Sequence, residues 1–462
     1  MASIFTYICN LTQHKEENPM KKSRILPALM AALMILALVA GCNGGSSSVT
    51  PPPSGTPATG EPAPQLSSLE QLLAMENKRP LGGLQPAFQE SRAHINKALP
   101  MSKTNNDNIV IAWASASQGS SFFTEMVKSA IERCDAYGYD FIMQVANFDL
   151  NAQMTQIENF LTQDIDFLVV NAVDIDATVA YYQQAVNKGV PVIVVGPTAA
   201  KPEYPLVTTV PSGSFESGFV VGEYLAEKLF SEYNGKELDV GFVFSRADDA
   251  DSNSRPCGFV SGYLFKQAEL NGKPYASRWD ATLEAYLVWT STVQSGSGKI
   301  DGIMNLLGYE AAGATDANSG QDAAGRLLTR YPNMNLLFAD TDSLSPGVLQ
   351  EIEQRGFVPG RDILVATGAD GAKYNLENIL AGKVIATGTN APYYTGAGVI
   401  ELIHRILGGF DANNMPASSY TPTYCVNVDN INTYYDPNLE FAAMMPWEAI
   451  TIDEYNRINA NR

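Results

Sequence analysis

The sequence contains very little histidine, which limits the chemistry that the chain can perform. Only three histidines, His14, His94 and His404, occur among 462 residues. None of them has a partner at the spacing that metal ligands require. We therefore expect neither a bound metal ion nor a cofactor.

Cysteine is also scarce, and its number argues against a disulfide framework. The five cysteines are Cys9, Cys42, Cys134, Cys257 and Cys425. Cys9 lies upstream of the segment that is interpreted below as a signal peptide, and Cys42 directly follows that segment. The remaining three are an odd number, which cannot form a complete set of disulfides in an exported protein. We expect them to be small buried residues.

Positive charge is the third deficit. Thirty Lys and Arg residues face 49 Asp and Glu residues, so the formal net charge is -19. Such a surface repels the phosphates of nucleic acids and the headgroups of anionic lipids. We therefore expect no nucleic-acid partner.

Motifs for nucleophilic or metal-assisted catalysis are missing too. The chain has no Gly-x-Ser-x-Gly elbow, no His-Glu-x-x-His and no Cys/His arrangement. An exported hydrolase is kept only as a less favoured alternative, because carboxylates are abundant enough to form a catalytic pair. We predict that the chain is not an enzyme.

The N-terminal region has the features of a secretory signal. Basic residues within 21–24 precede an apolar run over 25–40, which ends in Leu-Val-Ala-Gly-Cys42. The small residues before the cysteine resemble the lipobox of bacterial lipoproteins. By this resemblance, residues 20–41 form the signal peptide, starting at Met20, and Cys42 carries a lipid anchor. A transmembrane anchor is the alternative, but the run is short for a membrane span.

Two segments separate this leader from the main body. Residues 42–65 are rich in Gly, Ser, Pro and Thr, which is typical of a flexible tether. Residues 66–106 begin with helical spacing and then contain Pro and Gly, so we expect an extension packed loosely on the body. The body begins at residue 107.

The body alternates between short apolar runs and amphipathic segments. A strand over 109–112 leads through a small polar loop to a helix over 122–136, which Ser121 could cap. The alternation continues along the chain, with strands expected at 139–145, 167–170, 190–195, 239–244, 336–339, 363–367 and 384–388 and helices at 151–162, 177–188, 216–230, 255–268, 345–354, 373–380 and 394–407. This pattern predicts an α/β fold with two doubly wound parallel-sheet lobes.

An ordered series of short motifs gives the body a family resemblance. They are Phe122-Phe123, Asn171-Ala-Val-Asp-Ile-Asp-Ala177, Gly189-Val-Pro-Val-Ile-Val-Val195, Gly222-Glu-Tyr-Leu-Ala226, Arg255-Pro-Cys-Gly-Phe259, Trp279-Asp280, Phe338-Ala-Asp-Thr-Asp342, Gly368-Ala-Asp-Gly371 and Ala386-Thr-Gly-Thr-Asn390. In this order, the stretch 108–409 resembles the type I periplasmic sugar-binding proteins of the ribose and galactose class. Those proteins deliver ligands to ABC importers.

The resemblance implies two lobes joined by a multi-strand hinge. Three chain crossings would fall near Val210, near residues 390–392 and near Tyr420. The implied segments are a first lobe of 107–210 and 391–420, a second lobe of 211–390 and 421–440, and a C-terminal tail of 441–462.

The resemblance also implies which side chains bind a ligand. A sugar needs aromatic walls for its C–H face and charged, planar partners for its hydroxyl rim. The ligand-binding residues implied are Ser120, Phe122, Phe123, Arg255, Trp279, Thr341, Asp370 and Asn390. Phe122, Phe123 and Trp279 would be walls, and Arg255 and Asp370 would be the charged partners.

Several of these residues have structural alternatives. Arg255 could be a solvated residue at a helix end, and Asp370 could cap the helix that follows it. Trp279 could belong to the core. Trp113, inside the first strand, is expected to be a core residue, and Asp342 is expected to cap a helix rather than to touch ligand.

Two features depart from the resembled family. After the fourth strand the sequence reads Val-Gly196-Pro197-Thr198 where the family carries Asp-Arg, which removes a hydroxyl acceptor from the first lobe. This favours a less hydroxylated or modified ligand over ribose. The segment 280–335 is long, and we interpret it as an enlarged loop region.

The function implied is capture of a sugar or sugar-like molecule between lobes that close about a hinge. The bound ligand would pass to an ABC permease or to a membrane receptor. A sensing subunit for a chemoreceptor or sensor kinase is the alternative, because its binding chemistry would be the same. The implied location is the cell envelope, with the folded body outside the cytosol.

Overall fold

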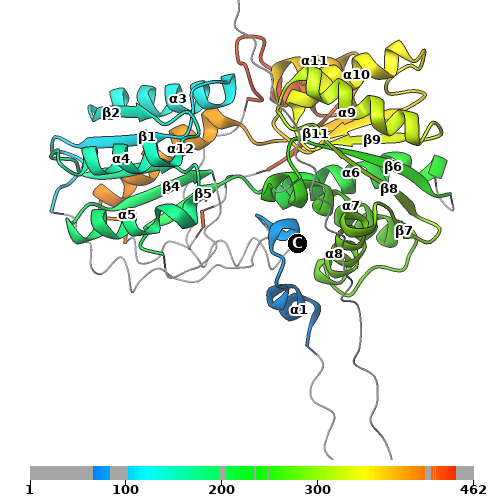
Figure 1. Ribbon diagram of the computed structural model, residues 1–462, viewed down its shortest axis with the longest axis horizontal. Helices are drawn as coiled ribbons and strands as arrows, with labels where there is room; N and C mark the ends of the chain where they lie inside the picture. Colours follow the sequence, from blue (N-terminus) through cyan, green and yellow to red (C-terminus); the bar gives the residue numbers. More distant parts are fainter. Residues whose placement is uncertain are drawn as a thin grey trace, which may run out of the picture. The chain divides into compact units, whose positions relative to one another are not determined.

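The computed structural model describes residues 66–83, 102–196, 204–233, 236–247, 249–411, 418–419, 421 and 423–443. The signal peptide, Cys42 and the tether lie outside these residues. The described chain from 102 onward is built on a five-stranded and a seven-stranded sheet (Figure 1), which confirms the predicted α/β class. None of its helices has the length and apolar composition to span a membrane.

The first lobe is built on a parallel sheet with the order β2-β1-β3-β4-β5. Its strands are β1 (Val110–Ser115), β2 (Asp140–Val145), β3 (Phe167–Asn171), β4 (Val192–Gly196) and β5 (Thr208–Pro211). Alternate residues of β1 enter different cores, as the two-residue period of a strand requires. Ile111 and Trp113 face one core, and Ala112 and Ala114 face the other. Trp113 is thus a core residue, as predicted.

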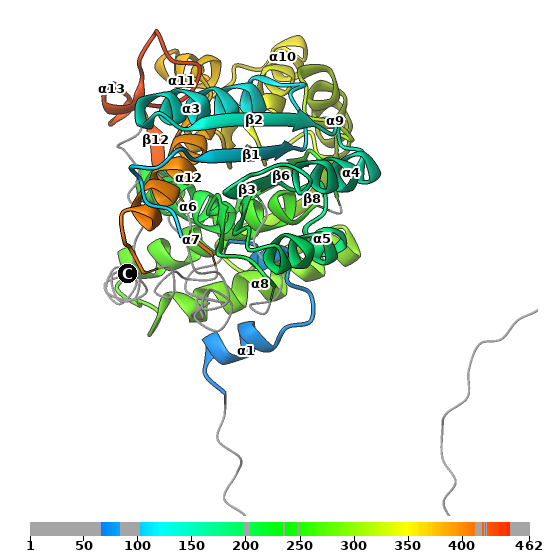
Figure 2. The same ribbon diagram turned by 90° about the vertical axis from the view of Figure 1, so that its left-hand side faces the viewer.

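Helices cover both faces of this sheet. They are α3 (Ser121–Tyr137), α4 (Leu150–Phe160), α5 (Ile175–Asn187) and α12 (Pro392–Leu407). The core on one face contains α3 and α12, and the core on the other contains α4 and α5 (Figure 2). The predicted capping role of Ser121 is wrong, because Ser121 is the first helical residue and Ser120 occupies the cap position without a side-chain bond.

The second lobe is built on a sheet with the order β12-β11-β10-β9-β6-β8-β7. Its strands are β6 (Leu238–Phe244), β7 (Gly298–Ile300), β8 (Met304–Ala311), β9 (Leu336–Ala339), β10 (Leu364–Thr367), β11 (Ala386–Gly388) and β12 (Cys425–Asn427). The five central strands are parallel, and only the edge strands β7 and β12 run antiparallel. The carboxyl ends of the central strands therefore share one edge.

The second sheet is also covered on both faces. Its helices are α6 (Ser214–Tyr233), α7 (Ala250–Leu270), α8 (Arg278–Ser295), α9 (Ala317–Arg330), α10 (Ser345–Gln354), α11 (Lys373–Leu380) and α13 (Ile431–Tyr434), with a 3-10 turn η2 (Asp342–Leu344). One core joins the sheet to α6, α7 and α8, and the other joins it to α9, α10 and α11.

The interpretation of 280–335 as an enlarged loop region is wrong. This stretch contains most of α8, the β7–β8 hairpin and α9. Ala281, Ala285 and Trp289 of α8 are fully buried in the core beneath the sheet. The segment is therefore part of the second lobe's framework.

Glycines bring α6 and α7 into close contact. A methyl group at Gly218 would lie 1.9 Å from the carbonyl oxygen of Arg255, and one at Gly258 would lie 2.0 Å from the carbonyl oxygen of Phe215. Gly222 and Gly262 make similar contacts one turn further along. Such an approach is open only to glycine. It fixes the part of α7 that carries Arg255.

The chain passes between the lobes three times. The first crossing follows β5, and the second lies between β11 and α12, as predicted near Val210 and residues 390–392. In the third, Ser419 N donates to Thr209 O at 2.7 Å and Thr421 N donates to Pro211 O at 3.1 Å. Tyr420 itself lies outside the described residues. The exact lobe boundaries remain a prediction.

The cysteines within the described chain are free. Cys134 and Cys257 are completely buried, and Cys425 is half-buried, which agrees with the expectation of small packed residues. Burial raises the pKa of the Cys134 thiol to about 12. This thiol is therefore protonated at neutral pH and poorly reactive.

Within the N-terminal extension, the described residues 66–83 pack tightly rather than loosely. It contains α1 (Ser68–Ala74) and the 3-10 turn η1 (Arg79–Leu81). Leu72 is fully buried in the core that α6, α7 and α8 share. Ser68 donates to Asp280 at the start of α8, and Phe215 N donates to Gly82 O at 3.0 Å. Residues 66–83 are thus an integral layer of the second lobe.

One buried carboxylate joins three strand ends of the second sheet. Asp342 follows β9 and is completely buried. Its Oδ1 accepts from Thr367 of β10 at 2.6 Å, from Thr387 of β11 at 2.8 Å and from Asn375 of α11 at 2.6 Å. Its Oδ2 accepts from the backbone N–H of Ala372 at 2.7 Å. Asp342 does not cap the helix that follows it, so the predicted capping role is wrong; its side chain instead joins these strand ends.

The environment of Asp342 disfavours its charged form. Burial, reinforced by the nearby charge of Asp370, raises its pKa from the ordinary 3.8 to about 7, although its hydrogen bonds act in the opposite direction. The carboxyl group therefore changes its protonation state near neutral pH while it remains buried.

Shortening Leu72 to Ala should destabilise the protein. Removal of a fully buried leucine costs about 2–5 kcal/mol through lost burial and the cavity left behind. Leu66→Ala is the matched control, because Leu66 precedes the same helix and is 54% exposed. Denaturant unfolding of both variants measures the difference. Equal midpoints would contradict a buried role for the extension.

The stability of the protein should carry a pH dependence from Asp342. Between about pH 4 and 7 the folded state binds more protons at this site than the unfolded state, so the site's contribution to stability falls as pH rises. The contribution of Asp342 to the free energy of unfolding should change by at most about 1.4 kcal/mol per pH unit. Asp342→Asn cannot titrate, so the difference in unfolding free energy between wild type and variant should shrink over this range.

Asp301→Asn is the control for this measurement, since the Asp301 side chain is 95% exposed. The comparison of variants cancels most of the effect of other carboxyl groups. A difference between wild type and Asp342→Asn that stays constant from pH 4 to 7 would show that Asp342 does not titrate there.

Candidate functional site

Four of the residues predicted to bind ligand come together at the carboxyl edge of the second sheet. Thr341 follows β9, Asp370 follows β10, Asn390 follows β11, and Arg255 lies in the second turn of α7. We call these four residues the strand-end cluster. They are close because parallel neighbouring strands end at the same edge of the sheet, where open α/β proteins bind ligands.

Asp370 connects the cluster. Its carboxylate accepts from the Thr341 hydroxyl at 2.8 Å and from the Asn390 amide at 3.3 Å. Burial raises its pKa, and the positive charge of Arg255 opposes this shift. The alternative that Asp370 caps α11 is wrong, because the cap position belongs to Ala372 and no side chain bonds there.

Arg255 is buried and largely unpaired. It is 6% exposed, and its Nη1 donates to the main-chain oxygen of Asp340 at 3.2 Å. Its Nε has no partner, and within the described chain no carboxylate lies at ion-pair distance. The alternative of a solvated helix end is therefore wrong.

The packing of Arg255 ties it to the Asp370 loop. A methyl group at Gly368, two residues before Asp370, would lie 2.9 Å from the Arg255 Cβ. Burial disfavours the charged form of Arg255, but the carboxylates of Asp251, Asp370 and Asp340 outweigh it and raise its pKa. Arg255 is thus a permanent cation whose remaining donors suit the oxygens of a polar ligand.

Asp340 is a buried residue of this region to which we assigned no role from the sequence. Its Oδ2 accepts from the backbone N–H and hydroxyl of Ser245, at 3.0 and 2.7 Å, and from the Ser252 hydroxyl at 2.5 Å. Its Oδ1 is buried without a partner. Its position directly after β9 could have marked Asp340 as a residue of the site. Its partners could not be predicted in this way, because Ser245 lies in the loop after β6 and Ser252 lies at the start of α7.

The first lobe contributes aromatic rings. Phe122 and Phe123 open α3 and are half-buried, and their rings meet edge to face at 5.6 Å. Phe123 also meets Phe148 at 5.6 Å in an edge-on arrangement. Ser120 is exposed beside them and has no capping bond. The structure thus brings Ser120, Phe122 and Phe123 together on the first lobe.

Phe148 was not predicted. It lies in the loop after β2, is 56% exposed, and together with Asn147 has a positive φ, at 60° and 51°. Such a backbone is uncommon for residues other than glycine and is frequent at functional sites. Its position directly after an expected strand, where ligand loops begin, was the signal that could have identified it.

Trp279 does not join the other predicted residues. It lies in the first turn of α8, ahead of the β7–β8 hairpin rather than in a loop after a strand. Its ring packs against the second lobe's core and lies 5.0 Å from the guanidinium of Arg278. Arg278 is in turn bound by Glu216 at 2.9 Å in a buried ion pair. The structure therefore favours the core alternative for Trp279.

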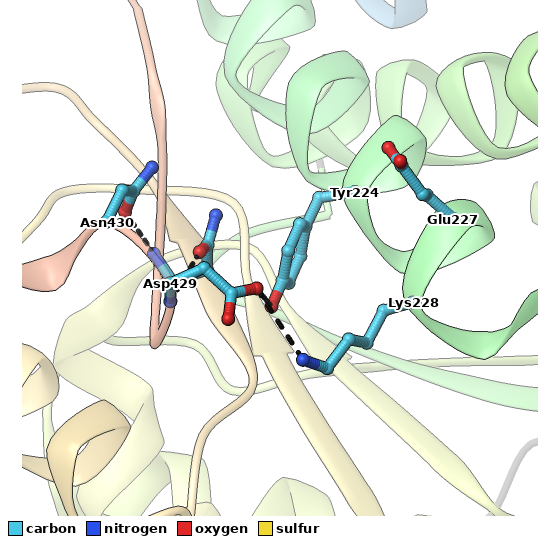
Figure 3. Close-up of a pocket in the computed structure, with 6 residues that line it drawn as sticks. Tyr224, Glu227, Lys228, Asp429 and Asn430 are labelled. Carbon is cyan, nitrogen blue, oxygen red and sulfur yellow. Dashed lines mark hydrogen bonds and ion pairs between the residues drawn. The ribbon is translucent and has the colours of Figure 1, made fainter.

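A hollow lies on the second lobe, away from the strand-end cluster (Figure 3). It is lined by Tyr224, Glu227, Lys228, Asn427, Asp429 and Asn430, and it shares no residue with the strand-end cluster. Asp429 accepts from the Tyr224 hydroxyl at 3.0 Å and pairs with Lys228 at 3.5 Å. Lys228 and Asp429 are exposed and pair with each other, and Glu227 is exposed as well. We therefore place the candidate site at the strand-end cluster.

Neither region has the composition of a metal centre. In the part of the chain that the structure describes, no group of three or more His, Cys, Asp or Glu side chains is arranged to hold a metal ion. The strand-end cluster offers one cation, one carboxylate, one amide and one hydroxyl. This set suits recognition of a neutral polar ligand by hydrogen bonds.

Comparison with known proteins agrees with this arrangement. Residues 111–410 match the family model for the periplasmic binding protein domain. The chain is 25% identical, over 68% of its length and 86% of the relative, to the ribose import binding protein RbsB of Bacillus subtilis (strain 168).

Solved structures show the same fold. An ABC transporter periplasmic solute binding protein from Actinobacillus succinogenes 130z, with bound D-allose, matches 71% of this chain and 100% of its own at a TM-score of 0.55 and 20% identity. The periplasmic binding protein of the arabinose ABC transporter from Shewanella sp. ANA-3, bound to L-arabinofuranose, is a second example. The match covers 70% of this chain and 93% of that protein, with a TM-score of 0.54 and 16% identity. The chain therefore belongs to the periplasmic binding protein family and has its type I two-lobed fold.

Proposed function

We propose that the chain is the substrate-binding subunit of an ABC-type importer and captures a sugar or sugar-like molecule between its lobes. The observation that carries this proposal is the convergence of Arg255, Thr341, Asp370 and Asn390 at three adjacent strand ends and one helix. Together they offer the fixed donors and acceptors that a rim of hydroxyl groups requires.

The two lobes divide the recognition between them. The second lobe supplies the polar strand-end cluster, and the first lobe supplies the rings of Phe122, Phe123 and Phe148. A sugar would direct its hydroxyl rim toward Arg255 and Asp370 and its C–H face toward the rings. Closure about the three crossings would bring the two sets onto one ligand.

The names of the relatives support this class of ligand. They include proteins for ribose import and proteins with bound D-allose or L-arabinofuranose. The relatives are named as binding proteins, which fits our proposal that the chain is not an enzyme. An ABC permease is the proposed partner.

Lipid attachment at Cys42 is a further part of the proposal. The tether of residues 42–65 would then hold the folded body off a membrane and outside the cytosol. This part depends on the N-terminal sequence, because these residues lie outside the described structure.

A panel of sugars should identify a stabilising ligand. We would record thermal unfolding of the purified chain with D-ribose, L-arabinose, D-allose, D-galactose and myo-inositol, and with L-leucine as a control without sugar chemistry. A ligand at a hundred times its Kd should stabilise the folded state by about 2.7 kcal/mol. If no sugar raised the Tm above the L-leucine control, the proposed ligand class would be wrong.

Replacement of Asn390 by Ala should weaken the binding of whichever sugar in the panel raises the Tm. The change removes an amide that holds Asp370 and can bond the ligand, so we expect about a tenfold rise in Kd by calorimetry. Asn438→Ala is the control, since the side chain of Asn438 is exposed and bonds Asp436 within its own turn. Unchanged affinity in a folded Asn390→Ala variant would exclude Asn390 from the site.

A further inference from the structure

The C-terminal segment 436–443 is attached to the loop that carries Asp370. Lys373 N donates to Glu440 O at 2.9 Å, and Ala442 N donates to Gly371 O at 2.7 Å. These bonds form a short antiparallel bridge between Ala372 and Phe441. The segment is therefore held by the second lobe, next to a residue of the strand-end cluster.

The side chain of Phe441 reaches the first lobe. Its ring is 7% exposed and meets the Phe122 ring edge to face, with centroids 6.2 Å apart and an interplanar angle of 85°. Phe441 and Ala372 belong to the core cluster that contains α3 and α12 of the first lobe. Phe441 thus joins a second-lobe backbone to a first-lobe core.

Phe441 also extends the row of rings on the first lobe. Phe441 contacts Phe122, Phe122 contacts Phe123, and Phe123 contacts Phe148. The row therefore begins on a segment anchored beside Asp370 and ends in the loop after β2. Because Phe441 is held by the second lobe and Phe122 by the first, this contact couples the positions of the two lobes.

The anchoring is close enough to transmit such a movement. Gly371 has a φ of +79°, and a methyl group there would lie 3.0 Å from the Cβ of Ala442. Lys373 Nζ donates to Pro437 O at 2.6 Å, and Ala443 N donates to Tyr434 O at 2.7 Å. The segment is thus bonded at several points to α11 and α13.

We propose that Phe441 is a positioning residue that controls ligand affinity by holding the first lobe's aromatic wall against the second lobe. Its relevance to ligand capture rests on the proposed function, whereas the contact itself is a feature of the fold. It limits the range of lobe positions and fixes the Phe122 ring. Both effects reduce the conformational entropy that is lost when a ligand binds.

The test measures lobe separation in the ligand-free protein. Spin labels carried by non-natural amino acids at Glu158 in α4 and Asp322 in α9, both exposed, report the distance between lobes. Phe441→Ala should broaden the distance distribution. Leu439→Ala is the control, because Leu439 lies in the same segment and is exposed, and it should leave the distribution unchanged.

Phe441→Leu keeps an apolar side chain beside Ala372 and decides the question if the alanine variant does not fold. It should broaden the distribution less than Phe441→Ala does. A distribution as narrow as wild type in the folded Phe441 variant would overturn the proposal, whether or not any sugar binds.

The affinity effect is measured separately with a sugar that raises the Tm of the wild-type chain. Phe441→Ala should raise its Kd roughly three- to tenfold, as expected for the loss of one aromatic pair. A broadened distribution with unchanged Kd would overturn the link to affinity. If no sugar of the panel bound, the proposed function would be refuted. The spin-label distances would then still decide whether Phe441 restrains the lobes.

Discussion

The arrangement of the second lobe depends on one buried carboxylate. Asp342 accepts hydrogen bonds from β10, from β11 and from both the side chain and the backbone of the region around α11. Three residues of the strand-end cluster lie close in sequence to the residues that make these bonds. Thr341 precedes Asp342, Asp370 lies between Thr367 and Ala372, and Asn390 follows Thr387 by three residues. A buried charge needs such a set of donors, because an unpaired carboxylate in a core is very costly. The hydrogen bonds that satisfy Asp342 thus set the spacing of the loops that carry the candidate site.

The order of elements in both sheets could be predicted from sequence, because buried parallel strands appear as short apolar runs between amphipathic helices. The segment 280–335 could not. Helix α8 packs on α7, on α1 and on the β7–β8 hairpin, so it buries Arg278, Thr282 and Thr292 as well as apolar residues. Its apolar stripe is correspondingly indistinct. Trp279 was assigned to the ligand site because the Trp279-Asp280 pair resembles a motif of the family, whereas the residue lies in the first turn of this helix.

The candidate site was predictable where it follows from strand ends. Thr341, Asp370 and Asn390 come directly after or close to adjacent parallel strands, and such residues share an edge whatever their separation in sequence. Asp340, Phe148 and Phe441 were missed because their roles depend on partners that no local pattern reveals. Asp340 is held by serines from the loop after β6 and from α7, Phe148 by a ring of α3, and Phe441 by Gly371 and Phe122.

The distribution of polarity between the lobes suggests why the C-terminal segment belongs to the body. The second lobe holds its polar residues in place by hydrogen bonds, which fix the positions of Arg255 and Asp370. The first lobe offers rings, whose contacts are less directional and would leave Phe122 free to reorient. Phe441 supplies the missing constraint, because its backbone is bonded to the ordered lobe and its ring packs on the other. A chain that ended before this segment would keep every polar residue of the strand-end cluster but would lose the contact that orients the aromatic wall toward it.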